Sequence, residues 1–320
     1  MAELQPEARS PDPVGRRGNV RVGVCSWSDS SLIKSKAFYP RGTGTAEKRL
    51  RYYAQQFPVV EVDSSFYAIP TPENSVLWAQ RTPENFVFNL KAFRLLTGHQ
   101  TPAQVFPPDI ARVLPPLTGR TRSYYYESLP PELLDELWRR FIEALAPLRA
   151  ADKLLAVHFQ FAPWATNSRE WRAHVEECVQ RMAGQLLSVE FRNATWLSEN
   201  NAPRTLAWLR ELGVAHTVVD GPQGVGNYAQ GVWEVTNPCL AVVRLHGRNV
   251  DTWSTKGLQA SSERFNYEYR DAELDELSTA IEDLAERTQE VVALLNVNYE
   301  DQGVRAAYAL TQLLQRLKGT

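Results

Sequence analysis

Ionisable and amide side chains occur at every second residue in short stretches that are otherwise apolar. In the stretch 59–65, Glu61 and Asp63 alternate with Val60 and Val62. Alternate residues of a β-strand point to opposite faces, so the polar residues of one stretch share a face. Across the chain this alternation selects Glu61, Asp63, Asn89, Lys91, His158, Gln160, Glu190, Arg192, His216, Asp220, Arg244, His246, Asn296 and Asn298, with Arg248 in the loop that follows.

Proton transfer is the first chemistry that these side chains support. Two carboxylates in different surroundings can act as an acid and a base, because burial raises a carboxyl pKa and neighbouring cations lower it. Glu61 and Glu190 lie on different predicted strands, and His246 adds an imidazole. These three residues are the candidate catalytic residues.

Anion binding is the second chemistry. Guanidinium groups bind phosphate or carboxylate through two parallel hydrogen bonds, and an ammonium group adds a further cation. Aromatic side chains near strand ends, such as Phe66, Tyr67 and Trp164, can stack on sugar or base faces. The candidate substrate-binding residues are Trp27, Lys91, Gln160, Arg192, Trp196, Arg244, Arg248, Asn296 and Asn298.

A divalent metal is a third possibility, and the identity of any cofactor stays open. The candidate metal ligands are Glu61, Glu190, Asp220 and His246, although no fixed ligand spacing such as H-E-x-x-H occurs. The chain also has no G-x-G-x-x-G and no G-x-x-x-x-G-K-[ST] motif, so it carries no motif for a nucleotide cofactor. The alternative to any site is a buried network in which these acids and bases only neutralise one another.

Eight β-rich stretches have to position these residues, and helical stretches separate most of them. The strands are expected at 21–27, 59–65, 86–93, 154–161, 186–193, 214–220, 240–247 and 291–298. Helices are expected at 46–56 after Thr45, at 72–81 after Thr71, at 131–149, at 168–183 after an Asn167–Glu170 capping box, and at 302–318.

This alternation predicts an α/β fold, a single (β/α)₈ TIM-type barrel, with an open doubly wound sheet as the alternative. Two segments depart from the repeat. One is a long, proline-rich excursion after strand three, at 94–130, and the other is an irregular connection between strands six and seven, at 221–239. In such barrels the C-terminal ends of the strands carry the chemistry, which is where the polar residues lie.

Several motifs resemble the YecE-like family, a domain of unknown function with the number seventy-two. They are GVCSWSD (23–29), FYP (38–40), LRYYAQQFPVVEVDSSFYAIP (50–70), WAQRTPENFVFNLKAF (78–93), QFAPWA (160–165), SVEFRNATW (188–196), VVRLHGR (242–248) and RFNYEYRDAEL (264–274). The resemblance implies a TIM barrel but no reaction. It carries the family's motif positions onto Glu61, Lys91, Gln160, Glu190, Arg192, Trp196, Arg244, His246 and Arg248.

Two departures from the family pattern affect the site. Thr97-Gly98-His99 has one residue inserted between the threonine and the histidine, which weakens a role for His99. The asparagine motif of the last strand is altered to Leu295-Asn296-Val297 followed by Asn298.

Composition limits the classes of protein that fit. The 320 residues are 43% hydrophobic and 22% charged, which is typical of a folded globular chain. With 35 basic and 37 acidic residues, the net charge of −2 argues against a globally basic nucleic-acid-binding protein. Three scattered cysteines and no long apolar run predict a cytoplasmic protein without a membrane segment. Residues 1–19 are expected to form a disordered tail before a single domain at 20–320.

We therefore expect an enzyme, a hydrolase or isomerase, that acts on a small anionic, phosphorylated or sugar-containing substrate at the C-terminal mouth of the barrel. A protein that binds or processes nucleic acid is the alternative, because cations and aromatic residues suit phosphates and unstacked bases. A non-catalytic barrel that binds a ligand or partner is a further alternative. The sequence leaves the oligomeric state open.

Overall fold

The computed structural model describes residues 16, 17, 19–117, 119, 121–222, 229, 231–253 and 265–317. Most of the predicted tail, residues 1–15 and 18, lies outside the described residues. Two residues of that predicted tail form the short strand β1 (Arg16–Arg17), which pairs antiparallel with the first strand of the barrel.

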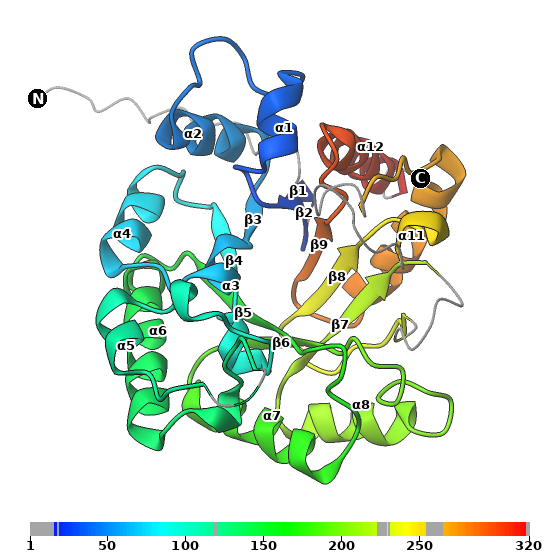
Figure 1. The fold of residues 1–320 in the computed structure, drawn as a ribbon. Helices are drawn as coiled ribbons and strands as arrows, with labels where there is room; N and C mark the ends of the chain where they lie inside the picture. The colour runs from blue at the N-terminus through cyan, green and yellow to red at the C-terminus, as the bar shows by residue number, and fades with distance from the viewer. Residues whose placement is uncertain are drawn as a thin grey trace, which may run out of the picture.

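Eight parallel strands close into a barrel (Figure 1). Each strand pairs with the next along the chain, and the last pairs with the first from Val20↔Val291 to Val24↔Leu295. The strands are β2 (Val20–Cys25), β3 (Val59–Val62), β4 (Val87–Lys91), β5 (Leu154–Gln160), β6 (Leu187–Glu190), β7 (Ala215–Asp220), β8 (Ala241–Leu245) and β9 (Val291–Leu295). The TIM-type barrel predicted from the sequence is thus confirmed, and an open sheet is excluded by the β2–β9 pairing.

Helices surround the barrel (Figure 1). They are α1 (Ser30–Ser35), α2 (Ala46–Gln56), α3 (Ser64–Tyr67), α4 (Pro72–Gln80), α5 (Pro108–Val113), α6 (Pro131–Ala150), α7 (Arg169–Arg181), α8 (Ala202–Glu211), α9 (Val250–Trp253), α11 (Asp271–Ala285) and α12 (Gln302–Leu317). Thr45 and Thr71 cap α2 and α4 as expected, each accepting a hydrogen bond from a backbone N–H three residues on. The capping box at Asn167 is wrong, because Ser168 is the residue that caps α7.

The excursion after β4 is structured. It holds three 3₁₀-helices, η1 (Arg94–Thr97), η2 (Ala103–Val105) and η3 (Tyr126–Ser128), together with α5. An isolated antiparallel bridge between Thr101 and Tyr124 ties its two halves together. In the connection between β7 and β8, the described residues 221, 222, 229 and 231–239 form no helix or strand, as expected.

Two apolar layers hold the barrel together. The outer layer packs one face of the strands against the helices and includes Val60, Val62 and Phe159. The inner layer fills the lumen with Val59, Val87, Ala156, Ala215, Val242, Val292 and Leu294 among others. Above that inner layer, towards the C-terminal ends of the strands, the lumen becomes polar, and this end is called the barrel mouth below.

Strand β7 reverses the predicted orientation. Ala215 points into the lumen, whereas Val218 packs in the outer layer, so His216 and Asp220, which share the parity of Val218, point outward. His216 Nε2 bonds the carbonyl oxygen of Val232 at 3.0 Å.

Within the described part of the chain, no helix is long and apolar enough to cross a membrane.

Candidate functional site

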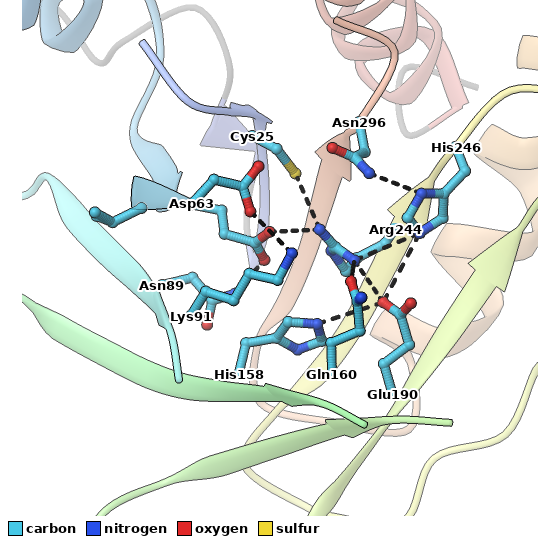
Figure 2. A network of polar contacts seen from close by, with 12 residues as sticks. Cys25, Asp63, Asn89, Lys91, His158, Gln160, Glu190, Arg244, His246 and Asn296 are labelled. Atoms are coloured by element: carbon cyan, nitrogen blue, oxygen red, sulfur yellow. Dashed lines mark hydrogen bonds and ion pairs between the residues drawn. The ribbon is translucent and has the colours of Figure 1, made fainter. Parts of the chain in front are cut away.

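Arg244 of β8 lies at the centre of the polar part of the lumen (Figure 2). Its Nη2 is 2.6 Å from Glu61 Oε1 and its Nη1 is 2.6 Å from Glu190 Oε2, and all three side chains are fully buried. Asn89 Nδ2 donates to the other oxygen of Glu61 at 2.9 Å. One guanidinium therefore joins strands β3, β6 and β8, as a fork with two carboxylate partners.

Arg244 and Glu190 are both charged. Burial alone would lower the pKa of Arg244, but Glu61 and Glu190 raise it well above its usual range. Burial alone would raise the pKa of Glu190, but Arg192 and Arg244 hold it well below its usual range. The carboxylate of Glu190 consequently stays ionised at neutral pH.

The two imidazoles of the network are neutral. Burial lowers the pKa of His246 to about 3, with the charge of Arg192 acting in the same direction, and burial also lowers the pKa of His158. Asn296 Nδ2 lies 2.8 Å from His246 Nδ1, so the remaining proton of His246 lies on Nε2, which faces Glu190 at 3.8 Å. His158 Nε2 lies 3.3 Å from the same carboxylate.

Gln160 and Arg192 extend the network towards solvent. Gln160 Oε1 accepts hydrogen bonds from Arg192 Nη2 at 3.0 Å and from Arg244 Nη1 at 3.2 Å. Arg192 Nε pairs with Glu190, and the Arg192 side chain is partly exposed. The amide nitrogen of Gln160 and the outer part of Arg192 thus lie at the floor of the mouth.

Lys91 and Asp63 form a second ion pair, with 3.2 Å between Lys91 Nζ and Asp63 Oδ1. The side chains are 11% and 20% exposed, whereas Glu61 and Glu190 are 0% exposed. Burial alone would raise the pKa of Asp63, but Lys91 and Arg244 lower it below its usual value. Solvent thus reaches both members of this pair, and Asp63 is ionised at neutral pH.

A cationic and aromatic cluster beside Lys91 contains residues that the sequence analysis missed or doubted. Lys91 Nζ lies 4.8 Å and Arg94 Cζ 5.4 Å from the ring centre of Phe66. His99 contacts the same ring edge-on at 4.9 Å. Burial, then the charges of Lys91, Arg94 and Arg192, lower the pKa of His99 to about 3. The three cations Lys91, Arg94 and Arg192, which lie around the neutral His99, are called the cationic cluster below.

Arg94 differs from the other cations of the mouth. Its Nε atom is buried without a hydrogen-bond partner, and within the described ranges no carboxylate lies at ion-pair distance from it. Burial lowers its pKa. The alternation that revealed the other residues ends with Lys91 at the end of β4, three residues before Arg94. The sequence signal for Arg94 is therefore only that it lies close to a polar strand end.

Several predicted site residues lie elsewhere. Asp220 accepts hydrogen bonds from Arg248 Nε at 2.9 Å and from the Tyr269 hydroxyl at 2.7 Å, and Arg248 also pairs with Glu276 of α11. This outward cluster arises because β7 turns Asp220 away from the lumen. Asp220 is therefore not grouped with Glu61, Glu190 and His246, and Arg248 is already bound to acids.

The two predicted tryptophans are packing residues. Trp196 is fully buried, stacks on Phe191 with 4.0 Å between ring centres, and donates from Nε1 to the carbonyl oxygen of Ala165 at 2.7 Å. Phe191 has the outward parity of β6, so Trp196 packs between the barrel and its helices. Trp27 is buried against Trp78 at 5.8 Å, with its Nε1 unbonded.

The altered asparagine motif places its two amides differently. Asn296 belongs to the network through His246. Asn298 has a buried Oδ1 without a hydrogen-bond partner and lines a narrow cavity beside Ser26 and Glu300.

The predicted metal ligands do not converge. Among the described residues, the group whose potential ligand atoms lie within 4.8 Å of one another is Cys25, Glu61 and Asp63. Arg244 Nη2 is 2.6 Å from Glu61 and 3.7 Å from Cys25 Sγ, and Lys91 neutralises Asp63. Burial, followed by the charge of Glu61, raises the pKa of the Cys25 thiol, which disfavours the thiolate that a metal needs. Protein cations already balance these ligands, so we assign no metal there.

Comparison with known proteins gives a consistent result. The family model described as "Protein of unknown function DUF72" matches residues 21–320. The chain is 30% identical over 281 residues to UPF0759 protein YunF of Bacillus subtilis (strain 168), covering 87% of this chain and 89% of the relative. A DUF72 family protein of Enterococcus faecalis V583 superposes with a TM-score of 0.75 at 26% identity, covering 92% of this chain and 95% of the other. Another from Thermotoga maritima MSB8 has a TM-score of 0.70 at 24% identity, covering 92% and 99%.

Proposed function

The chain belongs to the DUF72 family of proteins of unknown function, and from the geometry of its barrel mouth we propose that it is an enzyme acting on a small anionic substrate. The substrate is phosphorylated or carboxylated, and the reaction is a hydrolysis or an isomerisation that depends on proton transfer. The observation that carries the proposal is the cationic cluster, in which Arg94 has no carboxylate partner among the described residues, next to the solvent-reachable pair Lys91–Asp63.

Anion binding is assigned to Lys91, Arg94 and Arg192. Arg192 is held in place by Glu190 and Gln160, which limits the rotamer entropy that it loses on binding. Arg94 is half-buried and has no acidic partner to give up among the described residues. An anion that enters this cluster gains charge-assisted hydrogen bonds without breaking an existing ion pair of Arg94.

Proton transfer is assigned to Asp63 and Lys91. Asp63 is ionised at neutral pH and can accept a proton, and the ammonium of Lys91 can stabilise the charge that develops on the substrate. Glu61, Glu190 and His246, the residues expected to be catalytic, are fully buried below this pair. We assign them a positioning role, because their contacts fix Arg244 and Arg192.

A thermal-shift screen of the full chain tests anion binding. The probes are inorganic phosphate, a panel of phosphorylated metabolites, sugar acids and short oligonucleotides, each with and without Mg²⁺, Mn²⁺ and Zn²⁺. A small anion should raise the unfolding midpoint of the wild type by mass action, and Arg94→Ala should abolish the shift. Arg94→Ala removes a cation without leaving a carboxylate unpaired in the described structure, and Arg112→Ala on α5 is the matched control that should keep the shift.

Turnover is tested on the anions that bind. NMR follows each of them with wild-type protein and with Asp63→Asn, which should bind the anion but not convert it. If only oligonucleotides shift the midpoint, with a steep salt dependence, the protein binds nucleic acid instead. If anions bind and none is converted by the wild type, the barrel is a non-catalytic ligand-binding protein. If nothing shifts the midpoint, the proposal fails.

A further inference from the structure

A continuous row of aromatic rings runs past the cationic cluster. Ring centres are 5.1 Å apart for Tyr67 and Phe66, 4.9 Å for Phe66 and His99, and 5.9 Å for His99 and Trp164. Tyr125 follows at 6.3 Å from Trp164, and its hydroxyl accepts a hydrogen bond from Gln100 Nε2 at 2.7 Å. These five residues come from α3, from the excursion after β4 and from the loop after β5.

Trp164 and Tyr67 are the exposed members of this row, and Trp164 is the larger ring and the one that contacts His99. Trp164 is 45% exposed, although its two neighbouring rings hold it from the sides. A tryptophan ring offers a large apolar face, so a ligand that covers Trp164 would bury more apolar surface there than at any other type of side chain. Trp196 and Trp208, in contrast, stack on each other in the outer layer.

The exposed ring lies next to the place where the anion binds. His99 contacts both Trp164 and Phe66, and Phe66 carries Lys91 on its ring at 4.8 Å. Arg94 Cζ lies 5.4 Å from the centre of the same Phe66 ring. A ligand held by these cations therefore has two exposed rings within reach, Tyr67 in direct contact with Phe66 and Trp164 beyond His99. The indole of Trp164 offers the larger apolar face of the two.

Resting on the proposed function, we infer that the substrate carries a sugar ring beside its anionic group, with the apolar face of the sugar against Trp164 and the phosphate or carboxylate on Lys91 and Arg94. The sugar class is a hexose or pentose phosphate or a sugar acid. Trp164 is then the residue that distinguishes a cyclic substrate from an acyclic anion.

Hydrogen-bonding groups at the floor of the mouth favour a sugar over a nucleobase. Gln160 keeps its amide N–H groups as donors, and the carboxylate of Asp63 is an acceptor that solvent reaches. Such groups suit the several hydroxyls of a sugar. Among the described residues no second exposed ring faces Trp164 to enclose a base from both sides, because its ring neighbours His99 and Tyr125 contact it at steep angles of 65° and 71°.

The test compares ringed and ringless anions by calorimetric titration of the full chain. The probes are inorganic phosphate, glycerol 3-phosphate, a panel of hexose and pentose phosphates, and AMP. At least one sugar phosphate should bind wild type about tenfold or more tightly than the two ringless probes, the size expected for one stacking contact. Trp164→Ala should lose that advantage and keep the affinity for inorganic phosphate, whereas Trp164→Phe should retain most of the advantage.

Each other result is decisive. If ringless phosphates bind with dependence on Arg94 but no sugar phosphate binds more tightly, the sugar inference fails while the anion site stands. A sugar advantage that survives Trp164→Ala also overturns it. Tighter binding of AMP than of any sugar phosphate, lost in Trp164→Ala, would assign the ring to a base. Absence of binding by every anion removes the proposed function together with this inference.

Discussion

At the scale of single residues, the most constrained group is the guanidinium of Arg244, which water does not reach. It is held between Glu61 and Glu190, and both carboxylates are equally inaccessible. Buried charges are stable only when their partners offset the lost hydration, so each member of the trio depends on the others. Removing one member should lower the unfolding free energy much more than breaking a surface ion pair does.

Arg244→Met tests this dependence. The variant keeps most of the side-chain volume but leaves two buried carboxylates without their shared cation, and we expect it to lose about 3–5 kcal/mol of unfolding free energy. Urea denaturation at pH 7.5 measures the loss. Arg139→Met, which breaks only exposed pairs on α6, should stay close to wild type. Adding Glu61→Gln and Glu190→Gln should restore part of the stability; no recovery would mean that the loss came from packing rather than charge.

Acid sensitivity follows from the buried imidazoles. Burial lowers the pKa of His99 and His246 to about 3 and of His216 to about 4, all below the usual value of about 6.5 in an unfolded chain. The unfolded chain therefore binds more protons than the folded chain between those values. Stability contributed by these groups is full above pH 6.5 and falls as the pH drops towards 4.

Urea unfolding at a series of pH values from 7.5 to 4.5 should show that decline. His99, His216 and His246 each add a slope of about 1.4 kcal/mol per pH unit once the pH is well below 6.5. His216→Gln removes one such group, outside the lumen network, and should make the decline shallower by that amount. An unchanged slope would show that His216 is protonated in the folded protein.

The residues of the network were accessible to sequence reasoning because period-two alternation is strict in β3, β4, β5, β6 and β8. It could not reveal Arg94 and His99, since the excursion after β4 has no such period. It also misplaced Asp220, because the stretch 214–220 has apolar residues at both parities and so does not indicate which face is inside. Alternation also could not indicate that Trp196 packs outside the lumen, since a residue beyond a strand end has no fixed side.

At the scale of elements, close approach of strands β2 and β3 depends on a glycine. A Cβ atom added to Gly23 would lie 2.2 Å from the carbonyl oxygen of Val59 and 2.9 Å from its side chain. Val24 and Val60 are register partners one residue further along, so the two strands cannot separate locally without disturbing Glu61. The glycine thus helps to set the position of a network carboxylate.

Gly23→Ala should therefore destabilise the fold by about 1–3 kcal/mol through overpacking. The loss is measured by urea denaturation, and phosphate binding should weaken as well because Glu61 and Arg244 shift. Gly44→Ala is the matched control, since nothing lies within 4 Å of its added Cβ. Equal stability of the two variants would contradict the close packing of β2 on β3.

Local pattern predicted the eight barrel strands and five of the helices, whereas α8, α11 and the short helices were given no range. The helices expected at 46–56 and 131–149 match α2 and α6 within one residue, because apolar spacing and caps agree there. Helices such as α3 and the 3₁₀-helices are too short to show a period. Tertiary contacts hold them, as when Ser65 Oγ of α3 lies 2.6 Å from the carbonyl oxygen of Lys91.

At the scale of the whole molecule, closure makes the ends of the chain depend on each other. Strand β9 pairs with β2 over five residue pairs, and α12 after it packs on β2 and β9. Leu294 belongs to the inner apolar layer and Leu310 of α12 to the outer layer. Because neither layer is complete without the C-terminal residues, the N-terminal strands cannot keep their core if the C-terminal part opens.

We therefore expect one cooperative unfolding transition. Leu294→Ala and Leu310→Ala should each lower the unfolding free energy by about 2–5 kcal/mol, because each opens a cavity in a filled layer. Far-ultraviolet circular dichroism and the fluorescence of the nine tryptophans, which are spread from Trp27 to Trp253, should report the same midpoint in both variants. Two separated midpoints after Leu310→Ala would mean that the N-terminal strands hold together without β9. The N-terminal strands would then stay folded without β9. In that case the contacts of Arg244 with Glu61 and Glu190 would not be what joins the two halves of the barrel.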